Sequence, residues 1–386
     1  MDATLREPSY LYEWPESDRL KKVLYVESPK LEHCFTRSGS LMEDLVAVKA
    51  GELLQKTPSR PSVAPNIEGL KQLIVSGNLR SAVNLTTKIL TDLGQGFGMA
   101  GQPSRNTFLT FEIWASRFQL LMALKCYALL NDELSPFEEL DAPDLYTQYY
   151  PHVYRTLVPF SLRLVHAESL RFTPFPWATI RRINLLEENV TEIIEAETEK
   201  RSSPEVLDAW RKRLLVVQKL KARTLYCLKE YNLSILMYER ILAREENEEK
   251  KLALKLLLVR IAAVVGDEKS LLRFLNGLPV SANKEKDVLL HRCLKLVFYG
   301  QYTKALDLLK PFMSQLGDPR VWNNAAVCML YSGHINDALK LFEKYFETPN
   351  EPLVLNLVSI NELISRNIKQ KKVEFFFIFC FPGHDF

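Results

Sequence analysis

Three glycines near position 100 have the spacing of a phosphate-binding loop. Gly96, Gly98 and Gly101 form the pattern G-x-G-x-x-G. In dinucleotide-binding proteins such a loop follows a strand and opens a helix, and an acidic residue about 20 positions further on binds the ribose hydroxyls. The first question raised by the sequence is therefore whether the chain binds a nucleotide.

The surroundings of this loop argue against nucleotide binding. The segment before Gly94 has the apolar spacing of a helix rather than a strand, and no acidic residue lies near position 121. In a Walker loop, Lys and Ser or Thr would be required where Gln102 and Pro103 stand. We interpret the stretch as a flexible loop between two helices that binds no cofactor.

Side chains that could carry other chemistry are scattered along the sequence. None of the six histidines has a metal-ligand partner at helical spacing, and no two of the six cysteines form a C-x-x-C zinc pair. The sequence contains neither a G-x-S-x-G nor an H-E-x-x-H motif. Carboxylate pairs such as Glu187–Glu188 and Glu245–Glu246 lie in highly charged segments, which a solvated helix face explains. We expect a protein that is not an enzyme and holds no metal.

Composition is typical of a soluble folded protein. Apolar residues make up 47% of the 386 residues and charged residues 25%, enough to form a sizeable core. The formal net charge of +3 lacks the basic excess of a general nucleic-acid-binding protein. Charged residues near the N-terminus replace the apolar core of a signal peptide, and no apolar run reaches the roughly 18 residues of a membrane helix. We expect a cytoplasmic protein with reduced cysteines.

The clearest structural pattern is a pair of helices between positions 321 and 346. Large and small residues share the facing sides of the two helices: Trp322, Ala326, Ile335, Ala338 and Phe342. Gly333 allows a tight turn between them, and Ala326 and Ala338 allow the helices to approach closely. This order of a large residue, a small residue, a glycine turn, an alanine and an aromatic residue is typical of a tetratricopeptide repeat.

The same unit recurs upstream at spacings of 33, 34 and 37 residues. The matching residues at these three spacings are Gly300 with Ala305, Gly266 with Leu271, and Ser234 with Tyr238. Gly77 with Ala82 belongs to a further copy nearer the start of the sequence. Between positions 91 and 228 the period loosens, so we expect inserted loops there. The sequence predicts an all-α, tetratricopeptide-repeat-like helical solenoid with a mixed N-terminal segment and irregular inserted loops.

Four regions follow from these patterns. We expect a partly ordered or flexible N-terminal segment over 1–60 and divergent helical repeats with inserted loops over 61–228. Tetratricopeptide-like repeats then cover 229–366, and an atypical tail covers 367–386. The run Phe375–Phe379 in this tail is uncharged and β-prone, so we expect that it does not belong to the fold and suspect a truncated or mis-spliced product.

Two segments are candidate contacts for other molecules. A tyrosine-rich stretch that breaks the repeat period suits a protein interface, although it could also pack over the adjoining helices; it carries Tyr146, Tyr149, Tyr150 and Tyr154. The helical stretch 211–223 places Lys212, Lys219 and Arg223 on one face, where an acidic partner or anionic lipid could bind. A solvated helix face is the alternative explanation for these cations.

Residues 85–154 closely resemble the twelfth-subunit family of the transport protein particle complex, TRAPP. The stretches "NNAAVCMLYSGHINDAL" and "SRNIKQKK" resemble the same family, and the similarity extends over roughly residues 65–372. Many members carry a long acidic N-terminal region where this chain has only about 60 residues, and the end, residues 373–386, leaves the family pattern.

The resemblance implies a non-catalytic repeat subunit of a vesicle tether that acts between endoplasmic reticulum and Golgi and in autophagy. It implies partners among the other TRAPP subunits, the eighth and eleventh included, and an indirect link to a Rab GTPase. It also implies a location at the Golgi or the intermediate compartment, with at most peripheral membrane association through the complex. The alternative is a peptide-binding tetratricopeptide adaptor or co-chaperone. Asn324 stands at a plausible groove position for such binding, but no matching set of cations is evident.

Overall fold

The computed structural model describes residues 9–15, 52, 62–95, 106–141, 145, 156–278, 285–313, 318–344 and 351–364. Over these ranges the regular elements are α-helices and short 3-10 helices, and no strand occurs among them. The predicted all-α helical solenoid is therefore confirmed. The chain divides into two compact units between Met237 and Tyr238, inside helix α10 (Tyr231–Arg244). We call the described residues on the two sides of this boundary the N-terminal and the C-terminal unit.

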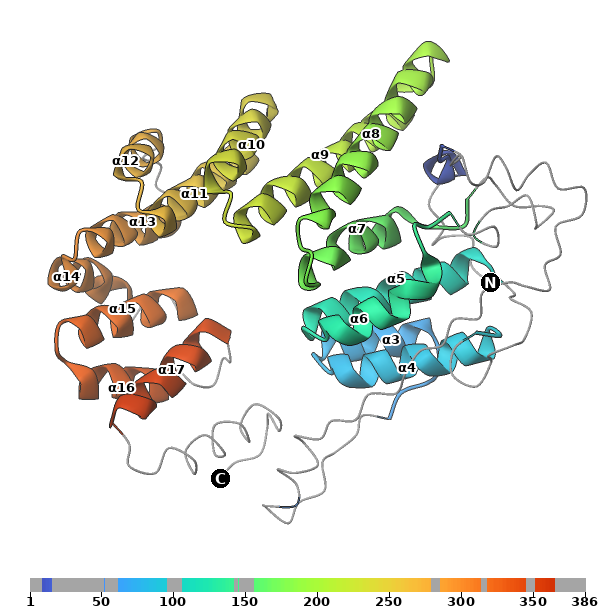
Figure 1. The fold of residues 1–386 in the computed structure, drawn as a ribbon. Helices are drawn as coiled ribbons and strands as arrows, with labels where there is room; N and C mark the ends of the chain where they lie inside the picture. The colour runs from blue at the N-terminus through green and yellow to red at the C-terminus, as the bar shows by residue number, and fades with distance from the viewer. Residues whose placement is uncertain are drawn as a thin grey trace, which may run out of the picture. The chain divides into compact units, whose positions relative to one another are not determined.

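Consecutive helices pack side by side within each unit (Figure 1). The N-terminal unit contains α3 (Ile67–Val75), α4 (Leu79–Asp92), α5 (Phe108–Ala123), α6 (Tyr127–Leu134), α7 (Phe160–Ser169), α8 (Ala178–Glu199) and α9 (Pro204–Cys227), with the 3-10 helices η2 (Ser9–Tyr12), η4 (Ser135–Phe137) and η7 (Leu170–Phe172). The C-terminal unit contains α11 (Glu248–Val265), α12 (Glu268–Asn276), α13 (Glu285–Phe298), α14 (Tyr302–Met313), α15 (Pro319–Tyr331), α16 (Ile335–Lys344) and α17 (Glu351–Ile364).

The four turn glycines selected from the sequence all have left-handed backbone conformations. Their φ angles are 76°, 82°, 70° and 86° at Gly77, Gly266, Gly300 and Gly333. At the last turn the amide of His334 donates to the carbonyl oxygen of Met329 at 2.9 Å, which closes the end of α15. Open space surrounds the position of a Cβ atom at each of the four glycines. Glycine is favoured there by the backbone conformation rather than by crowding.

Three further helix–helix turns have the same conformation without glycine. The φ angles of Lys125, Arg201 and Lys229 are 59°, 54° and 66°. The amide of Glu230 donates to the carbonyl oxygen of Leu225 at 2.9 Å, as in the glycine turns. The helical-hairpin unit therefore continues through the region where the sequence period loosens.

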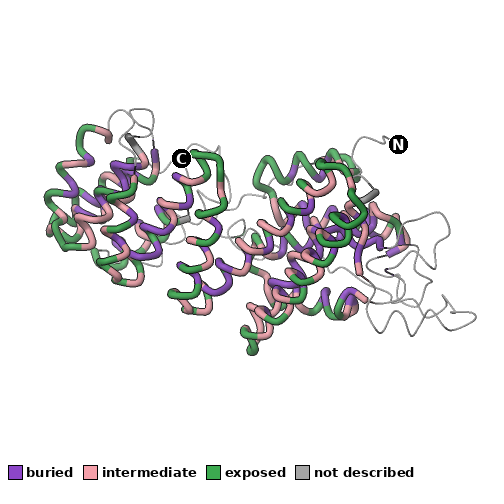
Figure 2. Tube along the Cα trace, turned by 90° about the horizontal axis from the view of Figure 1, so that it is seen from above, coloured by how far each residue is buried: buried purple, intermediate pink, exposed green. Residues whose placement is uncertain are grey.

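One pair of small or apolar residues packs around most of these turns, seven positions before and five after the left-handed residue. These pairs are Leu70 with Ala82, Phe118 with Leu130, Ala222 with Ser234, Val259 with Leu271, Cys293 with Ala305, and Ala326 with Ala338, and all twelve side chains are buried. Along each helix, buried positions alternate with exposed ones (Figure 2). Trp322 and Phe342 are also buried, and the Trp322 indole donates to the carbonyl oxygen of Met313 at 3.1 Å.

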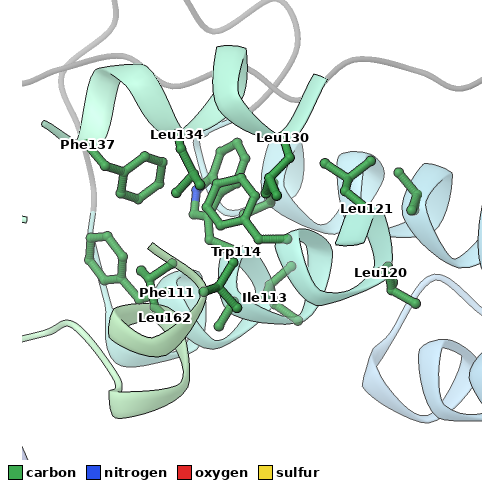
Figure 3. Close-up of a cluster of buried hydrophobic side chains, with 14 of the residues drawn as sticks. Phe111, Ile113, Trp114, Leu120, Leu121, Leu130, Leu134, Phe137 and Leu162 are labelled. Atoms are coloured by element: carbon green, nitrogen blue, oxygen red, sulfur yellow. The ribbon is translucent and has the colours of Figure 1, made fainter. Parts of the chain in front are cut away.

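Four aromatic side chains, Phe111, Trp114, Phe118 and Phe137, lie among the aliphatic residues in the core of the N-terminal unit (Figure 3). The rings of Trp114 and Phe118 on α5 stack at 5.3 Å, and Phe137 from η4 contacts both rings edge-on at 5.5 and 5.4 Å. Such edge-on contacts stabilise a core beyond the burial of area alone. This cluster attaches α6 and η4 to α5. Within the described part of the chain, no helix combines the length and the apolar character needed to cross a membrane.

Candidate partner-binding surfaces

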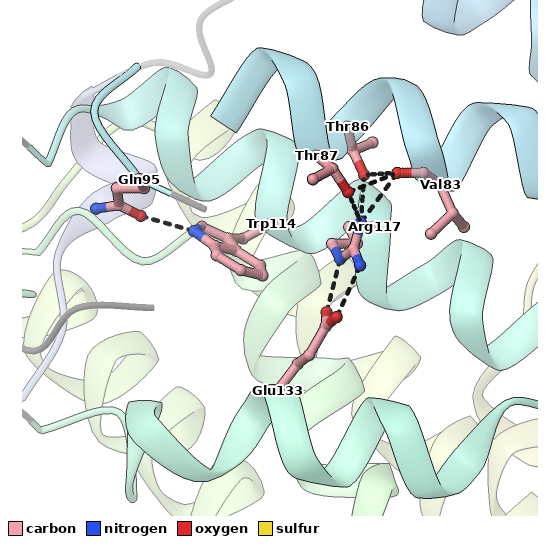
Figure 4. Close-up of polar contacts among 7 residues, drawn as sticks. All are labelled: Val83, Thr86, Thr87, Gln95, Trp114, Arg117 and Glu133. Atoms are coloured by element: carbon pink, nitrogen blue, oxygen red, sulfur yellow. Dashed lines mark hydrogen bonds and ion pairs between the residues drawn. The ribbon is translucent and has the colours of Figure 1, made fainter. Parts of the chain in front are cut away.

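The two ends of the glycine-rich loop meet in the core of the N-terminal unit. The glycines of the motif lie outside the described residues, but Gln95 and Asn106 flank them on either side. The side-chain amide of Gln95 donates to the Asn106 side chain. The side-chain oxygen of Gln95 accepts from the Trp114 indole at 2.7 Å (Figure 4). All three side chains are buried. The segment that precedes the loop is helix α4. A dinucleotide-binding loop follows a strand instead.

A buried ion pair joins α4, α5 and α6. The guanidinium of Arg117 donates to the two carboxylate oxygens of Glu133 at 2.6 and 2.7 Å (Figure 4). Its third nitrogen donates to the carbonyl oxygen of Val83 and to the hydroxyl of Thr87 at 2.9 and 2.8 Å. Because both charged side chains are buried and matched to each other, the pair holds three helices together instead of offering a group to a substrate.

The most exposed aromatic side chains of the N-terminal unit lie in the turn between η7 and α8. Phe175 is 78% exposed and Trp177 is 54% exposed. Large aromatic residues are normally buried, and they are enriched at the centres of protein interfaces. We call residues 173–177 the aromatic turn.

The backbone of the aromatic turn is held by local hydrogen bonds. The hydroxyl of Thr173 donates to the carbonyl oxygen of Leu170 at 2.7 Å and accepts from the amide of Phe175 at 3.3 Å. The amide of Ala178 donates to the carbonyl oxygen of Phe175 at 3.1 Å. Prolines at positions 174 and 176 restrict the chain further. The backbone that carries the two exposed rings is therefore preorganised, which lowers the entropic cost of binding a partner.

Sequence reasoning missed the aromatic turn. The available signal was the stretch "PFPW", in which two aromatic residues alternate with two prolines. Next to it, Phe172 stacks on Tyr127 with ring centroids 3.6 Å apart, so η7 is packed against α6. Apolar spacing alone could not distinguish the packed ring of Phe172 from the exposed rings that follow it.

Polar contacts between helices of the C-terminal unit recur at intervals of one helical repeat. The side chains of Asn323 and Asn356 stand 33 positions apart and share a 2.8 Å hydrogen bond. Arg320 and Asp287 are also 33 positions apart and form a 3.1 Å ion pair. These contacts link α13 to α15 and α15 to α17. Asn324 is half-buried beside them on α15.

The cation closest to Asn324 on its own helix face is already paired with acids. Arg320 lies one helical turn before Asn324, and its guanidinium contacts Asp318 at 2.9 Å as well as Asp287. These carboxylates, Asp318 first, raise the pKa of Arg320 above its usual value. A carboxylate-binding adaptor would need this charge for the end of its peptide. The arrangement therefore gives the adaptor alternative little support.

Comparison with known proteins gives two related sequences. The trafficking protein particle complex subunit 12 of Mus musculus is 29% identical over 86% of this chain and 46% of its own length. The subunit of the same name from Homo sapiens is also 29% identical, over 86% of this chain and 49% of its own length. No protein-family model matches the chain.

The chain is a relative of trafficking protein particle complex subunit 12. The resemblance seen in the sequence is thus confirmed. The chain spans about half the length of the curated relatives it matches. Their name describes these two proteins as subunits of a complex.

Two of the three cations on the basic stretch of this subunit 12 relative are paired. Lys212 contacts Asp208 at 2.6 Å, and Arg223 contacts the buried carboxylate of Glu168. Surface pairs of this kind lower the local positive charge available to lipid or to an acidic partner. The tyrosines 146, 149, 150 and 154 lie outside the described residues, and so does the tail 367–386. Among the residues that the structure describes, no cluster of three or more His, Cys, Asp or Glu could hold a metal ion.

Proposed function

We propose that this chain is a non-catalytic scaffold subunit of a TRAPP-like vesicle-tethering complex, active in endoplasmic reticulum-to-Golgi traffic and in autophagy. Its helical repeats bind other subunits, the eighth and eleventh among them, and its link to a Rab GTPase is indirect. It is cytoplasmic and reaches the Golgi or intermediate compartment through the complex. The names of the two related proteins support membership of such a complex, and the exposed aromatic turn supports the binding role.

The aromatic turn has the features of an interface anchor. Phe175 and Trp177 project from a backbone that is already ordered, and Arg181 follows on the exposed surface of α8 one turn later. Aromatic residues and Arg are the residue types most enriched at interfaces. On a partner they would fill apolar pockets without the cost of ordering a loop. This rigid exposed pair is the observation that carries the proposal.

The test is affinity purification of the tagged full chain and of a variant carrying Phe175→Ala and Trp177→Ala. Truncating an interface anchor typically costs about 2 kcal/mol or more of binding free energy, so the variant should lose at least one subunit. Leu185→Ala is the matched control, because Leu185 is 53% exposed further along α8. If the double variant keeps its circular dichroism and still purifies with every subunit, the aromatic turn is not the interface.

A further inference from the structure

A short N-terminal segment packs against helices of the N-terminal unit that lie far from it in sequence. Residues 9–15 include η2, and they pack against α5, α7 and α9. The side chains of Tyr12 and Trp14 are 5% and 8% exposed. The segment contributes a 3-10 helix rather than an α-helix, and Trp14 joins the cluster of buried side chains that contains Trp210.

One buried arginine binds the main chain of this segment. A guanidinium nitrogen of Arg213 on α9 donates to the carbonyl oxygen of Leu11 at 2.6 Å. The same guanidinium lies over the rings of Phe160 and Trp210, at 4.8 and 4.7 Å from their centroids. These two rings hold the donor in place. Since every residue has a carbonyl group, this contact does not depend on the side chain of the bound residue.

Aromatic contacts select the side chains at two positions. The guanidinium of Arg163 on α7 lies 3.9 Å from the centroid of the Trp14 ring. The ring of Tyr12 meets Phe108, the first residue of α5, edge-on at 4.6 Å. Both contacts require an aromatic ring on the segment.

The residue between these two positions faces outward. Glu13 is half-buried, and its carboxylate lies 3.5 Å from Lys200, at an exposed pair on the rim. Leu11 is partly buried against the cluster that contains Trp210. The surface therefore suits four successive residues: an apolar residue, an aromatic residue, a variable residue and a tryptophan. At the variable position an acidic residue can pair with Lys200 at the edge of the surface.

We propose that this surface of α5, α7 and α9 is a binding groove for short aromatic peptides and that residues 9–15 are its intramolecular ligand. A partner segment of the same apolar–aromatic–x–Trp pattern displaces them. The groups that the groove contacts are a main-chain carbonyl and two ring faces, which a segment from another protein supplies equally well. Covalent attachment raises the effective concentration of residues 9–15 at this surface, so weaker peptides are excluded until a matched partner arrives.

The experiment uses the full chain and a fluorescein-labelled peptide of residues 7–17, followed by fluorescence anisotropy. A variant with Tyr12→Ala and Trp14→Ala vacates the groove and should bind the peptide at least tenfold more tightly than the unaltered chain. Adding Arg213→Ala should weaken that binding at least tenfold. Adding Arg211→Ala, at an exposed position on the same helix, should leave it unchanged, and a scrambled peptide should not bind.

Hydrogen–deuterium exchange on the unaltered chain gives a second measurement that needs no substitution. Amides of residues 9–15 should exchange at least tenfold faster than those of α9, because a ligand in equilibrium leaves its groove without unfolding the repeats. Exchange as slow as that of α9 would show that the segment is an integral part of the core, and the proposal would be wrong. A folded, vacated variant that fails to bind the peptide would equally overturn it.

Discussion

The hydroxyl of Ser234 donates a 2.8 Å hydrogen bond to the carbonyl oxygen of Ala222, across the turn at Lys229. Both side chains are fully buried. Alanine takes the position of Ser234 in three other repeats, at Ala82, Ala305 and Ala338, five residues after the turn. A serine is tolerated at this close helix contact because its hydroxyl finds a backbone acceptor in the facing helix. The relationship places Lys229 at the position that glycine has in the turns at Gly77, Gly266, Gly300 and Gly333.

We predict that Lys229→Gly stabilises the chain. A left-handed conformation costs a residue with a Cβ about 1–2 kcal/mol. Glycine avoids this cost but loses more backbone entropy on folding, so the expected net gain in unfolding free energy is about 0.5–1 kcal/mol. Urea unfolding should show a higher midpoint for the variant. The reverse change, Gly333→Ala, serves as the paired comparison and should lower the midpoint. A loss of stability on Lys229→Gly would mean that the lysine side chain contributes contacts that outweigh its strain.

Ala338→Trp should overpack the contact between α15 and α16. The side chains of Ala326 and Ala338 have no exposed surface, so an indole can enter only by displacing a helix. Overpacking of this kind costs about 1–3 kcal/mol or more. Lys340→Trp, on the exposed face of the same helix, is the control and should change the thermal midpoint little. Equal midpoints for the two variants would show that α16 packs differently.

Stability should fall as the pH drops from 6.5 towards 4, in part through His166. Burial, with the nearby cation Arg182, lowers the pKa of this histidine from 6.5 to about 4, and its ring hydrogen-bonds the carbonyl oxygen of Glu138 at 2.7 Å. In this window the unfolded chain takes up a proton that the folded chain does not, so each pH unit costs up to about 1.4 kcal/mol. His166→Gln should flatten the dependence of the unfolding midpoint on pH. An unchanged slope would assign the effect to other groups.

Changing Tyr146, Tyr149 and Tyr150 together to Ala should release the chain from its partners. These rings break the repeat period in the segment that most closely resembles the TRAPP family, and one lost anchor typically costs about 2 kcal/mol or more. A pull-down should show the loss while circular dichroism stays near that of the unaltered chain. Unfolding of the triple variant would instead identify the tyrosines as core residues. Loss with the aromatic-turn variant but not with this one would place the interface near Trp177.

The sequence was sufficient to predict the helical-repeat fold, because small residues and glycines at fixed offsets encode the turn and the helix contact directly. It was insufficient where another residue type adopts the same backbone. Lys125, Arg201 and Lys229 are left-handed, yet their side chains carry no signal of it. The period seemed to loosen between positions 91 and 228 for this reason, although the hairpins continue.

The polar and surface features could not be predicted in the same way. Arg117 and Glu133 are 16 positions apart, and only the packing of two helices reveals that they are partners. Trp14 contacts Arg163, which lies 149 positions further along the sequence. The exposure of Phe175 depends on local hydrogen bonds that composition does not encode. Glycine spacing at position 96 suggested a chemistry that the preceding helix does not support.

The bond between Gln95 and Asn106 has a consequence for evolution and for engineering. Since the two ends of the glycine-rich loop are already held together in the core, the helices on either side do not depend on the number of residues between them. Doubling the length of a flexible loop costs only about 0.6 kcal/mol of closure free energy. We therefore expect this position to accept an epitope tag or a whole inserted domain without disturbing the array of repeats.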